Sequence, residues 1–268
     1  MIIDFHTHIF PDALAPRALG IMRETSDITP ANDGTASGLL ASMRRAGVGR
    51  AVVLNSATNT HQVEKVNAFA AETAAACPQL YPFGSLHPQT ENPKDVVRSI
   101  RARGLYGLKL HCDYVRTPVD DASYRPIFAA ACEYDLPVVI HAGYDPVSPD
   151  FVHATPDRIL KVLEAFPALK LVCAHFGGYA LWDEVAEKLC GRNLYLDTSL
   201  GSTSRGMTHA QAQRILDRHD PDKILFGSDL PWCREEDVRA FLGDLDISDE
   251  NREKLEYKNA MRLLQISQ

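Results

Sequence analysis

The stretch Asp4-Phe-His-Thr-His8 lies inside the first apolar run of the chain, Ile2–Ile9. Residues i and i+2 of a strand project from the same face, so His6 and His8 point together from the end of a predicted first strand. Two neutral imidazoles on one face are half of a four-ligand metal site. A doubly wound nucleotide-binding sheet would carry a glycine fingerprint at this place instead. The stretch therefore favours a closed barrel with a metal at its open end.

Short apolar runs and amphipathic segments alternate along the rest of the chain. The runs are rich in Val, Ile, Leu or aromatic residues and end at Gly, Pro, Asn or Asp, which indicates strands buried on both faces. The predicted strands are Ile2–Ile9, Ala51–Asn55, Tyr81–His87, Tyr106–His111, Val138–Gly143, Leu169–Phe176, Leu194–Ser199 and Lys223–Ser228. Apolar residues three and four apart predict helices at Val63–Cys77, Asp95–Arg103, Tyr124–Tyr134, Asp157–Phe166, Leu181–Leu189, Ala210–His219, Glu235–Leu242 and Ser248–Gln265.

This alternation predicts a parallel α/β fold. The length of 268 residues fits a (β/α)₈ TIM barrel, for which roughly 250 residues are typical. The sequence shows no linker, internal repeat or low-complexity stretch, so we expect a single domain over residues 1–268. The longest irregular segment, Phe10 to Thr35, is expected to be a loop over the active end of the barrel, with a short helix at Pro16–Met22.

The composition is that of an ordinary globular protein, with 45% hydrophobic and 24% charged residues. A formal charge of −7 without a cluster of basic residues argues against a nucleic-acid partner. The sequence has no apolar stretch long enough for a membrane span and no basic N-terminal region typical of a signal peptide. The six cysteines form no Cys-x-x-Cys pair, which suits a reducing compartment. We therefore expect a cytoplasmic protein that acts on a small molecule, and homo-oligomerisation is left open.

Titratable residues recur where the predicted strands end, which in a TIM barrel is the catalytic face. Besides His6 and His8, these residues are His87, Lys109, His111, His141, His175, Asp197 and Asp229. A third histidine and a carboxylate would complete a metal site with one position open for a water of lowered pKa. Asp229 is then placed to bind the metal and accept the water proton, and His175 to act as acid or base. The alternative role for Asp229 is that of a helix cap.

Ordered motifs give the chain a resemblance to a known family. They are Asp4-Phe-His-Thr-His8, Gly107-Leu-Lys-Leu-His111, His141-Ala-Gly143, Ala174-His-Phe-Gly-Gly178, Phe226-Gly-Ser-Asp229 and Asn259-Ala-Met-Arg-Leu263. Together they resemble the amidohydrolase superfamily, and within it the amidohydrolase-2 group that contains aminocarboxymuconate-semialdehyde decarboxylase. The resemblance spans nearly the whole chain. It implies a divalent ion held by His6, His8, His141 and Asp229, with His175 as the catalytic histidine.

The same resemblance leaves the number of metals open. One Zn²⁺ is the first expectation, and two metals, or another ion such as Mn²⁺, are the alternatives. Lys109 could be a carboxylated ligand of a second metal, as in two-metal members of the superfamily, or could contact a substrate carboxylate. His111 has the same side-chain parity on the strand as Lys109, so it shares these alternatives.

Two enzymatic functions use the same ligands. The first is hydrolysis of an amide, ester or lactone of a small, carboxylate-bearing molecule by metal-activated water. The alternative is non-oxidative decarboxylation of an unsaturated or aromatic acid. Hydrolysis is favoured as the broader class, and a non-catalytic barrel would be expected to lack ligand residues that this chain has. Loop residues predicted to contact the substrate are Tyr114, Arg116, Tyr144, Trp232 and Arg234.

Overall fold

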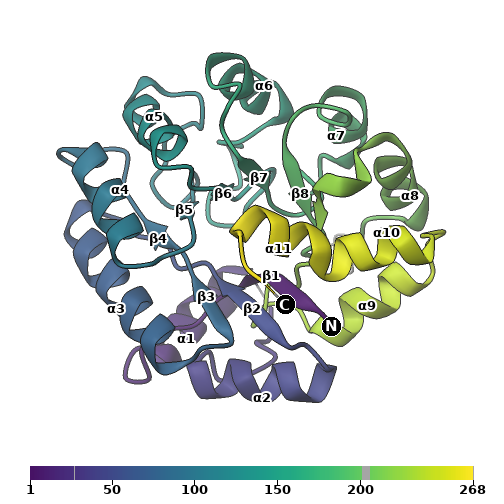
Figure 1. Ribbon diagram of the computed structural model, residues 1–268, viewed down its shortest axis with the longest axis horizontal. Coiled ribbons are helices and arrows are strands. Elements are labelled where there is room, and N and C mark those ends of the chain that lie inside the picture. Colours follow the sequence, from purple (N-terminus) through teal and green to yellow (C-terminus); the bar gives the residue numbers. More distant parts are fainter. Residues whose placement is uncertain (27, 201–205, 268) are drawn as a thin grey trace.

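Parallel strands and outer helices alternate through the computed structural model, which describes residues 1–26, 28–200 and 206–267 (Figure 1). The strands are β1 (Ile3–Thr7), β2 (Arg50–Val53), β3 (Leu80–Pro82), β4 (Gly84–Ser85), β5 (Leu108–Leu110), β6 (Val138–Ile140), β7 (Leu171–Cys173), β8 (Tyr195–Asp197) and β9 (Ile224–Leu225). The helices are α1 (Ala15–Ser26), α2 (Ala36–Ala46), α3 (Val63–Ala76), α4 (Pro93–Ala102), α5 (Arg125–Glu133), α6 (Pro156–Ala165), α7 (Trp182–Lys188), α8 (His209–Arg218), α9 (Glu235–Gly243), α10 (Asp249–Glu253) and α11 (Asn259–Leu264). Short 3₁₀ helices cover Thr60–Gln62, Ala122–Tyr124 and Pro221–Lys223, and a π turn covers Lys254–Lys258.

The sheet consists of two parallel sets of strands in chain order, β1 to β3 and β4 to β9. The sets join at Phe83 and Gly84, whose N–H groups donate to the carbonyls of Val53 and Gly107, at 2.9 Å each. The third predicted strand is therefore observed as two short strands, β3 and β4, on either side of Phe83. Phe83 donates its N–H toward β2, whereas Gly84 donates its N–H toward the segment that leads into β5. The third predicted strand therefore pairs with both sets of strands.

Backbone hydrogen bonds also close the sheet between its first and last strands. The N–H of Phe5 in β1 donates to the carbonyl of Phe226, just after β9, at 2.7 Å. Farther along the same seam, the Asp229 N–H donates to the His6 carbonyl at 2.7 Å. The TIM barrel predicted from the sequence is thus confirmed, and its closing seam carries two of the predicted site residues.

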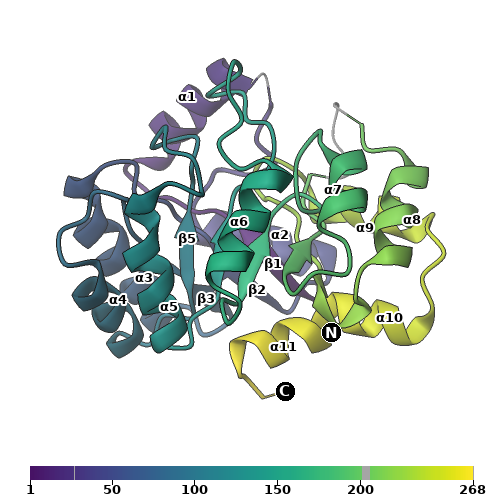
Figure 2. The same cartoon turned by 90° about the horizontal axis from the view of Figure 1, so that it is seen from above.

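The interior of the barrel is filled by apolar side chains from several strands. Phe5 and Phe83 meet edge to face, with ring centroids 5.8 Å apart and an interplanar angle of 84°. This interior cluster includes Leu225 and continues into Leu263 and Leu264 of α11. Figure 2 shows α10 and α11 at one end of the barrel and α1 at the other. The C-terminal helix therefore closes the amino end of the barrel, and the carboxyl end is left for a site.

Helix α2 was absent from the predicted helices, which began with the segment after the second strand. Its signals were present in the sequence, because the Thr35 side chain caps the first turn by accepting from the Gly38 N–H. Leu39, Met43 and Ala46 then repeat at helical spacing and are buried. Helix α1 also exceeds the predicted Pro16–Met22 at both ends. The connection after β1 is therefore more regular than the sequence analysis expected.

The remaining features bear on the environment of the chain. Among the described helices, none combines the length and the apolar character needed to cross a membrane. The six cysteines all lie in the described part of the chain, and no disulfide joins them.

The last predicted helix, Ser248–Gln265, is observed as α10, the π turn and α11 in succession.

Candidate metal centre

The closing seam of the barrel brings His6, His8 and Asp229 together. His6 lies in β1 and His8 directly follows this strand, while Asp229 lies four residues beyond the end of β9. The Nε2 atom of His8 is 2.9 Å from Oδ1 of Asp229, and Nε2 of His6 is 3.4 Å from the same oxygen. The two imidazoles thus turn the same ring nitrogen toward one carboxylate, as their i, i+2 spacing predicts.

The other ring nitrogen of each histidine is held by an acceptor outside this group. His8 donates its Nδ1 proton to the carbonyl oxygen of Leu54 at 2.7 Å. His6 donates its Nδ1 proton to Oδ2 of Asp197 at 2.8 Å. Because one nitrogen of each ring carries the proton, the Nε2 atom of a neutral ring presents a lone pair. This arrangement is typical of histidines that ligate metals.

The residues present fit a divalent metal ion. Tetrahedral ligands about 2.0–2.1 Å from an ion lie about 3.3 Å apart, and octahedral neighbours about 3.0 Å apart. The separations of 3.4 and 2.9 Å between the two Nε2 atoms and Oδ1 of Asp229 fall in this range. Burial, and next the neighbouring Lys109 cation, hold the pKa of His6 well below its usual value. His6 is therefore neutral near pH 7, the form in which imidazole binds metals.

A buried network keeps Asp229 at the seam. The Asp4 carboxylate accepts hydrogen bonds from the backbone N–H groups of His6 (3.0 Å) and Ser228 (2.9 Å) and from the Ser228 hydroxyl (2.5 Å). Asp4 therefore ties β1 to the segment that carries Asp229. Asp229 itself has a positive φ of 72°, a conformation that costs free energy in a non-glycine residue. The next helix, α9, has Arg234 as its N-cap residue, so Asp229 does not cap a helix.

His175 belongs to a second network on the opposite side of His6. The two rings are stacked, with centroids 5.1 Å apart. Nδ1 of His175 is 2.7 Å from the Ser199 hydroxyl oxygen, which is 2.5 Å from Oδ1 of Asp197. Burial, and next the proximity of His141, hold the pKa of His175 well below its usual value. Asp197 therefore contacts the His6 ring directly and the His175 ring through Ser199, and it also accepts from the His175 backbone N–H at 3.1 Å.

His141 lies beside His175 and is not among the ligand atoms of the His6–His8–Asp229 group. Its Nδ1 is 3.0 Å from Nε2 of His175. Its Nε2 is 3.2 Å from the Tyr144 carbonyl oxygen and 3.5 Å from Oδ2 of Asp145. The structure thus brings three of the four predicted ligands directly together and places the fourth next to the predicted catalytic histidine.

His111 and His141 form a further group with Asp145 that could hold a metal ion. Oδ2 of Asp145 lies 3.5 Å from Nε2 of each histidine. The two rings are stacked at 4.5 Å with an interplanar angle of 14°, and the Tyr114 ring stacks on the other face of His111 at 3.6 Å. Burial raises the pKa of Asp145 and lowers that of His111. The group is a candidate second metal position or part of the wall of the substrate site.

Lys109 is buried between these groups. Its Nζ lies 3.4 Å from Nε2 of His6, and it forms no ion pair with any residue of the described chain. Burial lowers the pKa of its ammonium group to about 8. The sequence placed Lys109 at a strand end, and the structure adds that this cation points at the candidate metal ligands.

The predicted substrate-binding residues take different places. Tyr114 stacks on His111, and its hydroxyl donates to the Met22 sulfur of α1 at 3.4 Å, which links it to the helix over the open end. Tyr144 offers its carbonyl oxygen to His141. Trp232 is half-buried against the core, and its backbone N–H donates to the Asp229 carbonyl at 2.8 Å. The two arginines, Arg116 and Arg234, are exposed.

One predicted site residue lies outside these groups, and two residues of the site were not predicted. His87 accepts from the Gln89 N–H and lies in none of the ligand groups found in the described chain. Ser199 and Asp145 were not predicted. Ser199 has the same strand parity as Asp197, so the sequence did hold a signal for it. Asp145 lies in a loop, where no periodicity indicates the direction of a side chain.

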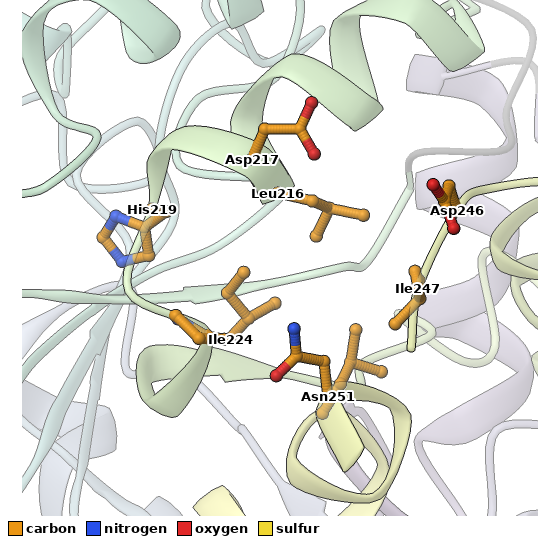
Figure 3. A pocket seen from close by; sticks show the side chains of 9 residues that line it. Leu216, Asp217, His219, Ile224, Asp246, Ile247 and Asn251 are labelled. Carbon is orange, nitrogen blue, oxygen red and sulfur yellow. The ribbon is translucent and has the colours of Figure 1, made fainter. Parts of the chain in front are cut away.

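Two cavities of about 230 Å³ lie away from the metal-ligand group. The first, shown in Figure 3, lies between α8 and α10, with Leu216, Ile224 and Ile247 among its lining residues. His219 borders it, but its two ring nitrogens contact the Gly191 N–H and the Leu194 carbonyl, so this histidine is part of the core. Arg116 and His153 are among the residues lining the second cavity.

The closed barrel and the ligand cluster at its carboxyl end define the class of protein: a TIM-barrel enzyme whose residues can hold a divalent metal. A family model described as amidohydrolase matches residues 3–266, so the chain belongs to this family, the amidohydrolase-2 group of the superfamily. The predicted resemblance is therefore confirmed. No curated protein matches the chain by sequence.

Solved structures similar to this chain cover nearly its full length. An uncharacterised TIM-barrel protein from Bordetella bronchiseptica is 24% identical over 98% of both chains, with a TM-score of 0.79. 5-Carboxyvanillate decarboxylase from Sphingomonas paucimobilis is 18% identical over 99% of both chains, with a TM-score of 0.72. A dihydroxybenzoic acid decarboxylase from a Polaromonas species, solved with manganese and the inhibitor 2-nitroresorcinol, is 16% identical over 98% of this chain and 96% of its own, with a TM-score of 0.72. At these identities the likeness establishes the fold.

Proposed function

We propose that the protein is a metal-dependent, non-oxidative decarboxylase of an aromatic or unsaturated carboxylic acid. The observation that carries this proposal is the buried Lys109 ammonium group beside the candidate metal ligands, which forms no direct ion pair within the described chain, although nearby carboxylates such as Asp229 act on it at longer range. A buried cation that no anion contacts directly is costly. A substrate carboxylate between Lys109 and a bound ion would neutralise both charges and form a charge-assisted hydrogen bond to Nζ.

The similar structures support decarboxylation as the first candidate function and hydrolysis as the second. The Sphingomonas and Polaromonas proteins are decarboxylases of aromatic acids, and the second was solved with manganese. The sequence alone favoured hydrolysis, because it is the broader chemistry of the superfamily. The same donor atoms serve either reaction, so hydrolysis of an ester, amide or lactone is the alternative.

For the metal, we propose that His6, His8 and Asp229 supply the ligand atoms, with His141 as the fourth ligand. Mn²⁺ and Zn²⁺ are both compatible with imidazole and carboxylate donors. When bound, such an ion withdraws negative charge from the substrate oxygens that it contacts. The chain itself contributes the neutral imidazoles, held in the required tautomer by Asp197 and the Leu54 carbonyl.

In the proposed reaction, the bond between the carboxylate carbon and the substrate breaks, and its electron pair stays on the substrate carbon while CO₂ leaves. That carbon must then receive a proton. We propose that Asp229 delivers this proton to the carbon. Its Oδ1 faces the two histidines, and its Oδ2 makes no hydrogen bond within the described residues. We assign to His175, which is stacked on His6, the role of returning a proton to Asp229 after the reaction. The organic product and CO₂ account for all atoms of the substrate carboxylate and the added proton.

A substrate panel tests the proposal. The purified protein, loaded in turn with Mn²⁺ and Zn²⁺, is incubated with hydroxylated aromatic acids, unsaturated diacids, and a matched set of esters, amides and lactones. We expect CO₂ release from one or more acids, and its loss on chelation and in His8→Ala. The reverse result, turnover of an ester, amide or lactone without CO₂ release from any acid, would establish the hydrolytic alternative.

A further inference from the structure

The backbone that carries His175 is strained, and the roles assigned so far do not explain what holds it. His175 and Phe176 have positive φ angles of 62° and 53°, and Gly177, at 85°, continues the same left-handed turn. This region of φ favours glycine and is rare for a bulky residue such as phenylalanine. A strained conformation persists only where the surrounding contacts hold it. The contacts of this turn therefore identify the residues that position His175.

Strand β8 holds the N–H groups of the turn. The backbone N–H of His175 donates to Oδ1 of Asp197 at 3.1 Å, and the backbone N–H of Phe176 donates to the Asp197 carbonyl at 2.7 Å. A single residue of β8 thus fixes two successive N–H groups. The carbonyl side of the turn needs a separate partner, because the carbonyl of a peptide group points away from its N–H.

Helix α7 supplies that partner through a side chain. Trp182, the first residue of α7, is 4% exposed, and its indole N–H donates to the His175 carbonyl oxygen at 3.1 Å. The Trp182 ring packs edge to face on Tyr179, with centroids 5.6 Å apart. An indole is a donor only, and its partner is a backbone carbonyl. This hydrogen bond therefore has the same direction whatever the protonation of the histidines.

The peptide group between His175 and Phe176 is held from both sides. Its N–H is bound by β8 and its carbonyl by α7. The peptide group before His175 is held by the Asp197 carboxylate. When both peptide planes that flank a Cα atom are fixed, the direction of the Cα–Cβ bond is fixed as well. These contacts therefore determine the point from which the His175 imidazole reaches its stacked position on His6.

We infer that Trp182 is a positioning residue, whose indole N–H holds the left-handed turn that directs the His175 imidazole to the candidate metal centre. Without this hydrogen bond, the turn can relax toward negative φ, and rotation about the N–Cα bond then moves the side chain of His175. The inference rests on the proposed function, in which His175 returns a proton to Asp229.

Amide hydrogen exchange tests the inference without a substrate. Trp182→Phe keeps an aromatic ring in the core and removes the indole N–H. Exchange is followed by mass spectrometry in peptides covering residues 174–181, and global stability is measured by urea unfolding. We expect the amides of the turn to exchange about two- to tenfold faster in Trp182→Phe, beyond any change in global stability, because one neutral hydrogen bond is lost.

Leu189→Ala is the matched control. Leu189 is fully buried at the end of the same helix, and its side chain has no hydrogen-bonding group. This variant should lower global stability without a local acceleration of exchange in the turn. The same local acceleration in both variants would make Trp182 a packing residue only. That result, or unchanged exchange in Trp182→Phe, would overturn the inference.

Turnover provides a second readout. For an acid that the wild-type protein decarboxylates, Trp182→Phe should lower kcat by about two- to tenfold. KM and metal affinity should stay unchanged, because the hydrogen bond ends on the backbone of a residue that binds neither substrate nor metal in the proposed reaction. A raised KM with unchanged kcat, or faster exchange of the turn without any loss of kcat, would contradict the positioning role. If the wild-type protein releases CO₂ from no acid, the proposed function fails, and the exchange experiment still decides whether Trp182 holds the turn.

Discussion

The hydrogen bond from His6 to Asp197 offers the sharpest test of the candidate metal centre. In Asp197→Asn, three donors around Oδ1 would hold the amide oxygen on their side and turn the NH₂ group toward His6. Two donors would then face each other across 2.8 Å. His6 can avoid this clash by moving its proton from Nδ1 to Nε2, which occupies the lone pair needed by a metal. Loss of a charge-assisted hydrogen bond of about 1.5–3 kcal/mol corresponds to a roughly tenfold to hundredfold loss of metal affinity.

The assay is a competition titration of Mn²⁺ and Zn²⁺ against a chelator of known affinity, with circular dichroism to verify the fold. Asp120→Asn is the matched control, because Asp120 makes two ion pairs, with Arg158 (2.5 Å) and Lys161 (3.0 Å), away from the site. Asp120→Asn should bind metal as the wild-type protein does. If Asp197→Asn also binds metal with wild-type affinity, the role assigned to Asp197 in orienting His6 is wrong.

Three further substitutions test separate parts of the structure. His8→Ala should lower metal affinity by more than about hundredfold while His87→Ala, outside the ligand groups, leaves it unchanged; comparable binding by the two variants would contradict the ligand assignment. Lys109→Met should raise the KM for a carboxylate substrate by about tenfold or more without lowering the urea midpoint, since it removes a buried charge; an unchanged KM would exclude Lys109 from substrate binding. Burial raises the pKa of Glu235 from 4.5 to about 7, and neither carboxyl oxygen has a hydrogen-bond partner in the described chain. The folded protein therefore holds this proton more tightly than the unfolded chain, and the free energy of unfolding falls as the pH rises from about 4.5 to 7. Relative to wild type, Glu235→Gln should be more stable by roughly 3 kcal/mol at pH 8 and nearly unchanged at pH 4.5 in urea unfolding; an equal difference at both pH values would refute this assignment.

Strand parity explains which parts of the site were predictable. His6 and His8 were expected to share a face, and both present Nε2 to Asp229. The barrel then determines where distant strand ends meet, so Asp229 could be placed near the pair from the fold alone. Asp197 was also predicted as a candidate partner of a ligating histidine, and it accepts the His6 proton.

The unpredicted features depend on contacts that periodicity does not encode. The direction of His141 is set by the Tyr144 carbonyl and by Asp145, which lie in a loop. Helix α2 is a different case, because its N-cap Thr35 and its apolar spacing are present in the sequence but were not recognised as a helix. Loop positions and the final ring orientation of a histidine are fixed by tertiary packing, so they require the structure.

The same chemistry that holds a metal does not by itself choose between hydrolysis and decarboxylation. In hydrolysis, Asp229 must take a proton from water, whereas in decarboxylation it must give one to carbon. The strand ends supply identical ligand atoms in both cases, so the choice depends on which substrate bond is held beside Asp229. One buried group near the site bears on this choice, the Lys109 ammonium, which attracts an anion. A carboxylate held by Lys109 beside the metal ligands is itself the group that decarboxylation removes, whereas hydrolysis would need that carboxylate to be a second group of the substrate, and this difference favours the decarboxylase.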